Sequence, residues 1–99
     1  MIAWDIYEIS SDAHPLTSVK MRGRLRKFSL SKHMHMLVEN TEEIEGRVRF
    51  AVETKQDIRE IKKFLEKLIP DVKIEKKLEN IKNPVLSKLK INEEERYEI

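Results

Sequence analysis

Two short runs of alternating apolar residues precede one long helical stripe, and this change of period most constrains the fold of the 99-residue chain. Residues 34–38 and 48–52 each place an apolar side chain at every second position, with a polar interruption at 40–43 between them. Successive side chains of a strand point to opposite faces of a sheet. The two runs therefore predict a β-hairpin with one buried face.

The clearest helix comes directly after this hairpin. Its apolar residues recur at helical spacing and form one stripe, made by Ile58, Ile61, Phe64, Leu65, Leu68 and Ile69. Thr54 and Asp57 resemble a capping box at its start, and Pro70 predicts its end.

The remaining segments fit around this hairpin and helix. Residues 3–9 and 72–78 have strand composition, and apolar residues four and three apart predict a helix within 19–32, although Gly23 leaves a strand open for part of it. The order β-α-β-β-α-β is typical of an α+β ferredoxin-like sandwich, in which an antiparallel sheet carries two helices on one face.

The end of the chain is predicted as a loop over residues 80–84, a final strand over 86–91 and an acidic tail. At this length and 39% hydrophobic content we expect a single domain over residues 1–99. The heavy use of charged residues, 38% of the chain, is typical of proteins from hot environments.

Composition excludes several classes of protein. The absence of cysteine excludes disulfides, a thiolate nucleophile and cysteine-ligated metal clusters. The sequence has no signal-peptide pattern and no apolar run of the roughly 20 residues that a membrane span needs, so we expect a cytoplasmic protein without membrane contact.

Charge is distributed unevenly along the chain. No acidic residue lies between Asp12 and Glu39, although Asp and Glu make up 18 of the 99 residues. That gap contains three histidines, His14, His33 and His35, and the basic residues Lys20, Arg22, Arg24, Arg26, Lys27 and Lys32. The clustering predicts that this segment binds an anion.

Two positions within and beside this segment resemble the acylphosphatase family. Its members have a phosphate-binding loop that ends in an arginine, and a second strand that ends in an asparagine beside Thr or Ser. Here VKMR ends at Arg22, and the segment LVENTEE contains Asn40, 18 residues after Arg22. VLSKLKI at 85–91 also looks like a later strand of the animal enzymes.

The loop itself departs from the family pattern. The family reads G-R-V-Q-G-V-x-F-R, whereas this chain reads HPLTSVKMR at 14–22, which keeps Val19 and Arg22. The missing glycines matter because a backbone cradle for an anion needs a close approach and unusual φ angles. A member of the fold that has lost catalysis is therefore an alternative.

The resemblance implies hydrolysis of an acyl phosphate without a metal, a cofactor or a covalent intermediate. Arg22 would grip the phosphoryl oxygens, and Asn40 would hold the attacking water. The remaining phosphate contacts would come from the loop and the helix start, at Thr17, Ser18, Val19, Lys20 and Met21.

Two other readings come from other classes of protein. A ferredoxin-like sheet with basic segment 20–32 could be a non-catalytic module that binds an anion or nucleic acid, although an aromatic-rich pattern for base stacking is missing.

His33 and His35 are expected on one strand face, on the open side of the sheet. With His14 they make no recognised metal-ligand spacing, so we predict no metal site. The sequence does not specify the oligomeric state.

Overall fold

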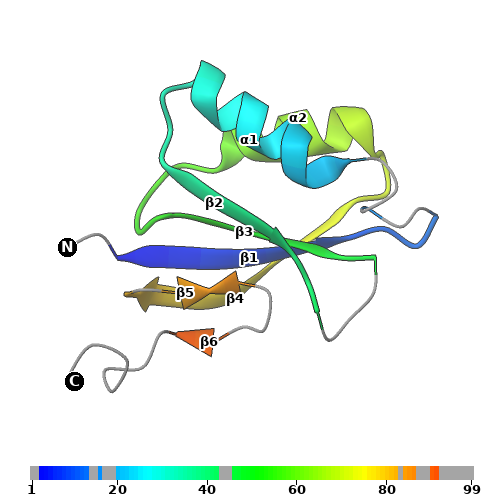
Figure 1. Cartoon of the computed structure of the whole chain (residues 1–99). Helices are drawn as coiled ribbons and strands as arrows, with labels where there is room; N and C mark the ends of the chain where they lie inside the picture. The colour runs from blue at the N-terminus through cyan, green and yellow to red at the C-terminus, as the bar shows by residue number, and fades with distance from the viewer. Residues whose placement is uncertain are drawn as a thin grey trace.

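The computed structural model describes residues 3–13, 16, 20–42, 46–82, 84–86 and 90–91. Its first six elements are β1 (Trp4–Ser10), α1 (Met21–Ser31), β2 (Met36–Asn40), β3 (Val48–Glu53), α2 (Arg59–Leu68) and β4 (Lys73–Ile81). These four strands form one antiparallel sheet in the order β2-β3-β1-β4, and both helices cover the same face (Figure 1). The predicted α+β ferredoxin-like fold is confirmed.

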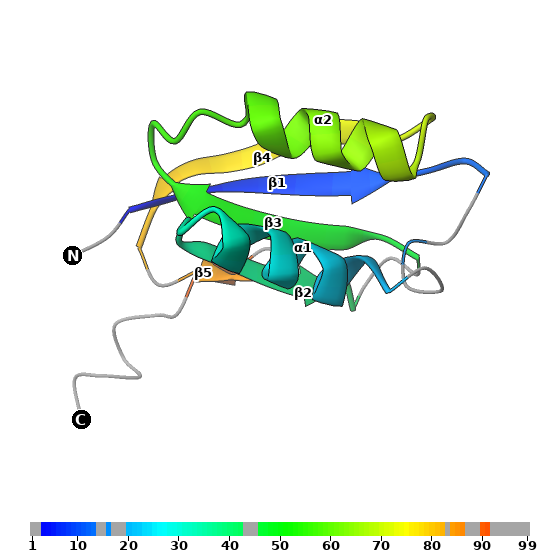
Figure 2. The same ribbon diagram turned by 90° about the horizontal axis from the view of Figure 1, so that it is seen from above.

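The main core lies between the sheet and the helices. Viewed from above, α1 runs over the β2 side of the sheet and α2 over the β4 side (Figure 2). Tyr7 and Phe50 are cross-strand partners with ring centroids 5.2 Å apart, and Leu25 of α1 and Leu65 of α2 are fully buried in the same cluster. Each such leucine stabilises the fold by about 1.5–3 kcal/mol. Neither described helix is long and apolar enough to cross a membrane.

The start of β2 differs from the prediction. The helix stops at Ser31, and His33 adopts the left-handed conformation with φ 54°. The amide of His33 donates to Leu30 O and that of Met34 to Ser29 O, which is the Schellman arrangement. β2 consequently begins at Met36, so the expectation that His33 and His35 share a strand face is wrong.

The start of α2 also differs. Thr54 does not cap the helix, because its Oγ1 donates to Asp5 Oδ1 at 2.8 Å. Asp57 instead accepts the amide of Arg59 at 2.9 Å, and the helix begins at Arg59. The predicted capping box is therefore wrong, whereas the predicted stop before Pro70 is confirmed by the end of α2 at Leu68.

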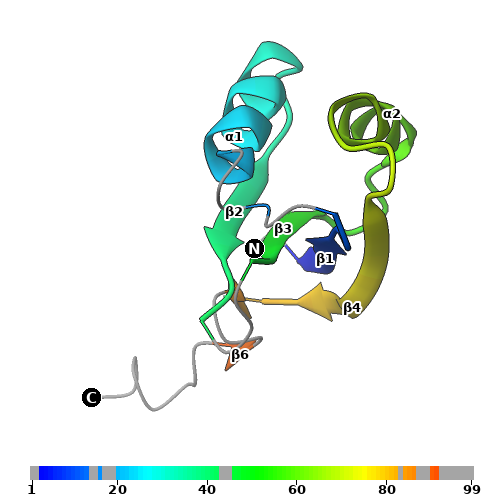
Figure 3. The same cartoon turned by 90° about the vertical axis from the view of Figure 1, so that its right-hand side faces the viewer.

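The face of the sheet opposite the helices is partly covered by the end of the described chain. β5 (Pro84–Val85) pairs with β6 (Lys90–Ile91) as a separate two-stranded sheet on that side (Figure 3). Leu86, only 3% exposed, packs there against Ile6 and Ala51. The predicted final strand over 86–91 is confirmed at Lys90–Ile91 and wrong at Leu86, which follows β5, and 87–89 lie outside the described residues.

The predicted loop over 80–84 is also shorter than expected. β4 continues to Ile81, and Pro84 already belongs to β5. The sequence pattern missed this extension because β4 pairs with β1 through irregular register shifts, so its side chains do not alternate cleanly.

A buried ion pair lies beneath the β5 segment. Glu8 and Arg49 are cross-strand partners, 3% and 1% exposed, with Arg49 Nε 2.8 Å from Glu8 Oε1. Arg49 Nη1 also donates to Leu86 O at 3.0 Å. This charged pair therefore connects the sheet to the segment that covers it.

Candidate functional site

Arg22 and Asn40 line the same pocket. It has a volume of about 320 Å³ and lies where α1 begins beside the end of β2. We call it the α1 pocket, and its lining residues are Lys20, Met21, Arg22, Gly23, Arg26 and Asn40. The predicted phosphate-binding residues Thr17, Ser18 and Val19 lie outside the described residues.

The position of the pocket follows from how the loop before α1 is anchored. Leu16 is fully buried, and its amide donates to Gly46 O at 2.9 Å in the turn between β2 and β3. Leu16 O in turn accepts the amide of Met21 at 3.3 Å. These bonds hold the first turn of α1 against the end of β2, where Asn40 lies.

The first turn of α1 has no side-chain cap and no acidic residue of its own. Lys20, at the N-cap, is left-handed with φ 56° and ψ 39°. The first backbone amides of a helix have no partner within it. Among the described residues no acceptor bonds the amides of Arg22 and Gly23. The helix dipole adds a partial positive charge at the same place.

Two guanidinium groups beside the pocket share one carboxylate. Glu39 Oε1 lies 3.1 Å from Arg26 Nη2, and Glu39 Oε2 lies 3.6 Å from Arg22 Nη1. All three side chains are about half exposed. Because β2 is an edge strand, the Glu39 side chain can reach these helix residues past the end of the sheet.

Sequence reasoning missed Glu39 and Arg26 as parts of the site. The signal for Arg26 was its position four residues after Arg22, which puts both on one side of a helix. Glu39 was the acid that ended the basic segment, but its reach toward α1 depends on β2 being at the edge of the sheet.

Asn40 presents an unused acceptor. Its Oδ1 is buried and accepts no hydrogen bond from the described residues. The next residue, Thr41, closes the hairpin through its amide, which donates to Arg47 O at 3.1 Å. Buried acceptors are nearly always bonded to protein or water, and the described residues supply no donor to this Oδ1.

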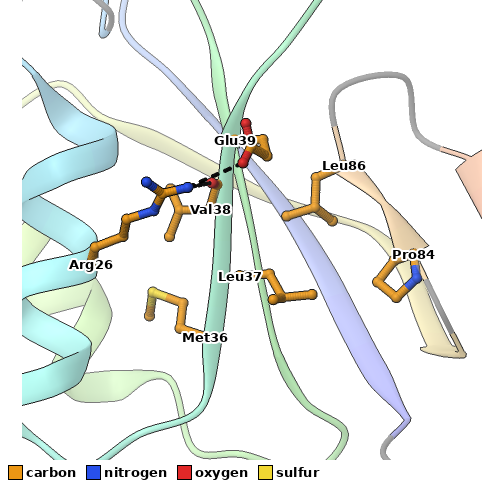
Figure 4. A pocket seen from close by; sticks show the side chains of 7 residues that line it. All are labelled: Arg26, Met36, Leu37, Val38, Glu39, Pro84 and Leu86. Carbon is orange, nitrogen blue, oxygen red and sulfur yellow. Dashed lines mark hydrogen bonds and ion pairs between the residues drawn. The ribbon is translucent and has the colours of Figure 1, made fainter.

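A second pocket, of about 460 Å³, lies along the free edge of β2. We call it the edge pocket, and Figure 4 shows Arg26 on one side of β2 with Leu37, Pro84 and Leu86 on the other. Its remaining lining residues are Met36, Val38 and Glu39. Arg26 is common to both pockets.

The histidines lie away from the α1 pocket lining. His35 Nδ1 forms a hydrogen bond with Glu53 Oε1, and His33 is exposed in the turn after α1. His14 lies outside the described residues. Within the described part of the chain no three His, Cys, Asp or Glu side chains gather as metal ligands would.

The aromatic side chains are not arranged as a platform for bases. Tyr7 and Phe50 are buried, and Phe28 and Phe64 stack on each other between the helices with centroids 4.4 Å apart. Trp4 is half-buried against the cluster beneath Leu86. Of the described aromatic residues, none stands exposed on the open face of the sheet.

In comparisons with known proteins, no family model, curated protein or solved structure matches the chain. A function is therefore inferred from its own residues and from the geometry of the α1 pocket.

Proposed function

We propose that the chain is a small cytoplasmic acylphosphatase-like hydrolase, and that the α1 pocket holds the phosphoryl group of an acyl phosphate. The observation that carries this proposal is that Arg22 and Asn40 line one pocket, at a helix start without a described cap. A guanidinium group, helix amides without a described partner and a carboxamide are the groups that the acylphosphatase resemblance implies, and they act by positioning and electrostatic stabilisation of the phosphoryl group.

The contacts with the phosphoryl group follow from which donors have no partner among the described residues. The Met21 amide already donates to Leu16 O, so we assign the backbone contacts to the amides of Arg22 and Gly23. The Arg22 guanidinium group contributes a two-pronged, charge-assisted contact with two phosphoryl oxygens. Lys20 and Arg26 add positive charge at the pocket wall.

Asn40 acts on the attacking water. Its carboxamide accepts a hydrogen bond from the water, whose lone pair then points at phosphorus in line with the leaving carboxylate. Water forms the new P–O bond while the P–O bond to the acyl group breaks, and the electron pair leaves with the carboxylate. The water proton passes to a phosphoryl oxygen, so the dianionic acyl phosphate gives a carboxylate and dihydrogen phosphate. No general base is required.

Hydrolysis of acetyl phosphate and benzoyl phosphate tests the proposal. The wild-type chain is expected to hydrolyse both, and Arg22→Ala and Asn40→Ala are each expected to lower kcat/KM by about 100-fold or more. Arg59→Ala is the matched control, because Arg59 is an exposed helix arginine paired with Asp57 at 2.6 Å, outside the α1 pocket lining. A wild-type chain without turnover, or equal loss in Arg59→Ala, rejects the proposal.

A second function, phosphate or nucleic-acid binding without catalysis, is favoured by one observation. The six basic residues of segment 20–32 are all exposed, and this segment has no acidic residue. Such a surface binds polyanions without reading sequence, and its affinity falls steeply with salt. Tight, salt-dependent binding of short oligonucleotides that Asn40→Ala leaves unchanged, together with no acyl phosphate turnover, would support this alternative.

A further inference from the structure

We infer that the edge pocket holds the acyl group of the substrate, so that the chain prefers acyl phosphates with an extended apolar acyl chain over acetyl phosphate. This inference rests on the proposed function. It adds a second subsite to the α1 pocket and a substrate class that the phosphate contacts alone do not select.

The two pockets are neighbours that share one lining residue. Arg26 lines both, and Glu39, which lines the edge pocket, pairs with Arg22 in the α1 pocket. Val38 in the edge pocket and Asn40 in the α1 pocket lie two residues apart on β2, about 7 Å along the strand. A phosphoryl group at Asn40 therefore has its acyl substituent within reach of the edge pocket.

The lining of the edge pocket suits an acyl chain. Five of its seven lining side chains are apolar. Leu37 is 38% exposed and faces Leu86 and Pro84 across the pocket in Figure 4. An exposed leucine beside other apolar side chains gains free energy when a ligand covers it. Acetyl phosphate has a single methyl group, which would leave most of the apolar lining of the edge pocket in contact with water.

The edge of β2 supplies a polar contact at the junction. The amide of Thr41 donates to Arg47 O. Because hydrogen-bonded and non-hydrogen-bonded pairs alternate along an antiparallel ladder, Glu39 and Leu37 also form backbone bonds with β3. Val38, which lies between them, therefore directs its N–H and C=O away from β3. Val38 O accepts from Arg26 Nη2 at 3.1 Å, as this geometry requires. None of the described residues accepts from the outward Val38 N–H, which is in position to donate to the carbonyl oxygen of the bound acyl group.

Arg26 lies where the leaving group develops charge. Its guanidinium group is held by Val38 O and by Glu39 Oε1, both at 3.1 Å, between the two pockets. When the P–O bond breaks, the electron pair stays on the departing carboxylate, next to this cation. Arg26 thus stabilises the same leaving group whose apolar chain the edge pocket holds.

A series of acyl phosphates from acetyl to hexanoyl tests the inference. One fully buried methylene is worth about fourfold in binding, so partial burial of four methylenes predicts a kcat/KM roughly tenfold higher for hexanoyl than for acetyl phosphate. Leu37→Ser is expected to bring this ratio close to one. Leu30→Ser is the matched control, because Leu30 is also exposed, at 76%, and is absent from the lining of both pockets. Leu30→Ser should keep the ratio.

The outcomes separate the inference from the proposed function. Turnover of acetyl phosphate with no chain-length preference overturns the inference and leaves the proposed function standing. If the wild-type chain hydrolyses none of the series, the proposed function fails, and binding of hexylphosphonate against methylphosphonate, followed by NMR, still tests the edge pocket. Equal affinities for the two phosphonates overturn it. A concentration-dependent dimer that Leu37→Ser abolishes would assign the pocket to a second copy and would also overturn the inference.

Discussion

Glu39 Oε1 lies 3.1 Å from Arg26 Nη2, and the same carboxylate extends its other oxygen to Arg22, so both arginines at the α1 pocket face an internal anion. A bound phosphate must compete with this carboxylate for the two guanidinium groups. Glu39 is therefore expected to weaken anion binding, by an amount set by the strength of two half-exposed ion pairs.

Replacement of Glu39 measures that competition. Exposed ion pairs contribute about 0.2–1 kcal/mol, so Glu39→Gln is expected to lower the Kd for inorganic phosphate by about 1.4- to fivefold. Glu60→Gln is the matched control, because Glu60 forms a comparable exposed pair with Lys32 at 3.6 Å, away from the pocket lining. A higher Kd in Glu39→Gln would mean that the carboxylate positions the arginines for the ligand instead.

The buried pair of Glu8 and Arg49 predicts a large cost for removing one partner. Arg49→Met leaves the Glu8 carboxylate buried with fewer donors and is expected to lower the free energy of unfolding by about 3–5 kcal/mol. The double variant Glu8→Leu with Arg49→Met should recover much of this loss, since no unpaired charge remains. Urea denaturation measures both, and a double variant no more stable than Arg49→Met alone would contradict the prediction.

Acid should destabilise the fold through Glu8 and Asp5. Burial raises the pKa of the Glu8 carboxyl, but hydrogen bonds from Arg47 and Arg49 outweigh it, so its pKa is lowered from the ordinary 4.5. Burial likewise raises the pKa of Asp5, but hydrogen bonds from Asn80 and Thr54 outweigh it, and its pKa is lowered from 3.8.

The sign of the pH effect follows from these lowered pKa values. The unfolded chain takes up protons at a higher pH than the folded chain, so the stabilisation is present above the ordinary values and is lost as pH falls through the lowered ones. Unfolding free energies from urea denaturation should hold down to about pH 5 and then decrease. Asp5→Asn, which removes one of these titrations, should show a shallower decrease. An equally steep decrease in Asp5→Asn would count against the role of Asp5.

Substitution by alanine is expected to change the stability of the fold in opposite directions at the two glycines. Gly23 lies inside α1, and an added Cβ there would meet no atom within 4 Å, so Gly23→Ala is expected to stabilise the fold by about 0.5–1 kcal/mol. Gly46 has φ 82°, which side chains rarely adopt, so Gly46→Ala is expected to destabilise it by about 1 kcal/mol. Thermal unfolding gives both signs, and a lower Tm for Gly23→Ala would show that the pocket wall needs the glycine.

Local patterns were sufficient to predict the fold. The stripe that ends before Pro70 and the alternation at 48–52 reflect burial against a single core, and the structure buries Ile61, Leu65 and Phe50 there. The start of β2 was not predictable in the same way, because His33 instead of glycine occupies the left-handed position of the Schellman arrangement after α1.

The site was predictable only in part. Arg22 and Asn40 were identified from a family resemblance, and they do line one pocket. The edge pocket needed coordinates, because Pro84 and Leu86 approach β2 across a long stretch of sequence, and the sequence pattern placed Pro84 in a loop. The sharing of Glu39 by two arginines also depends on the position of β2 at the sheet edge.

A phosphate titration followed by NMR tests the central claim most directly, since it reports on binding without requiring turnover. The account predicts saturable shifts that are largest at the backbone amides of Arg22 and Gly23 and at the side-chain amide of Asn40, and that disappear in Arg22→Ala. Shifts that do not saturate, or that are largest at lysines of α2 such as Lys62 and Lys63, would contradict it.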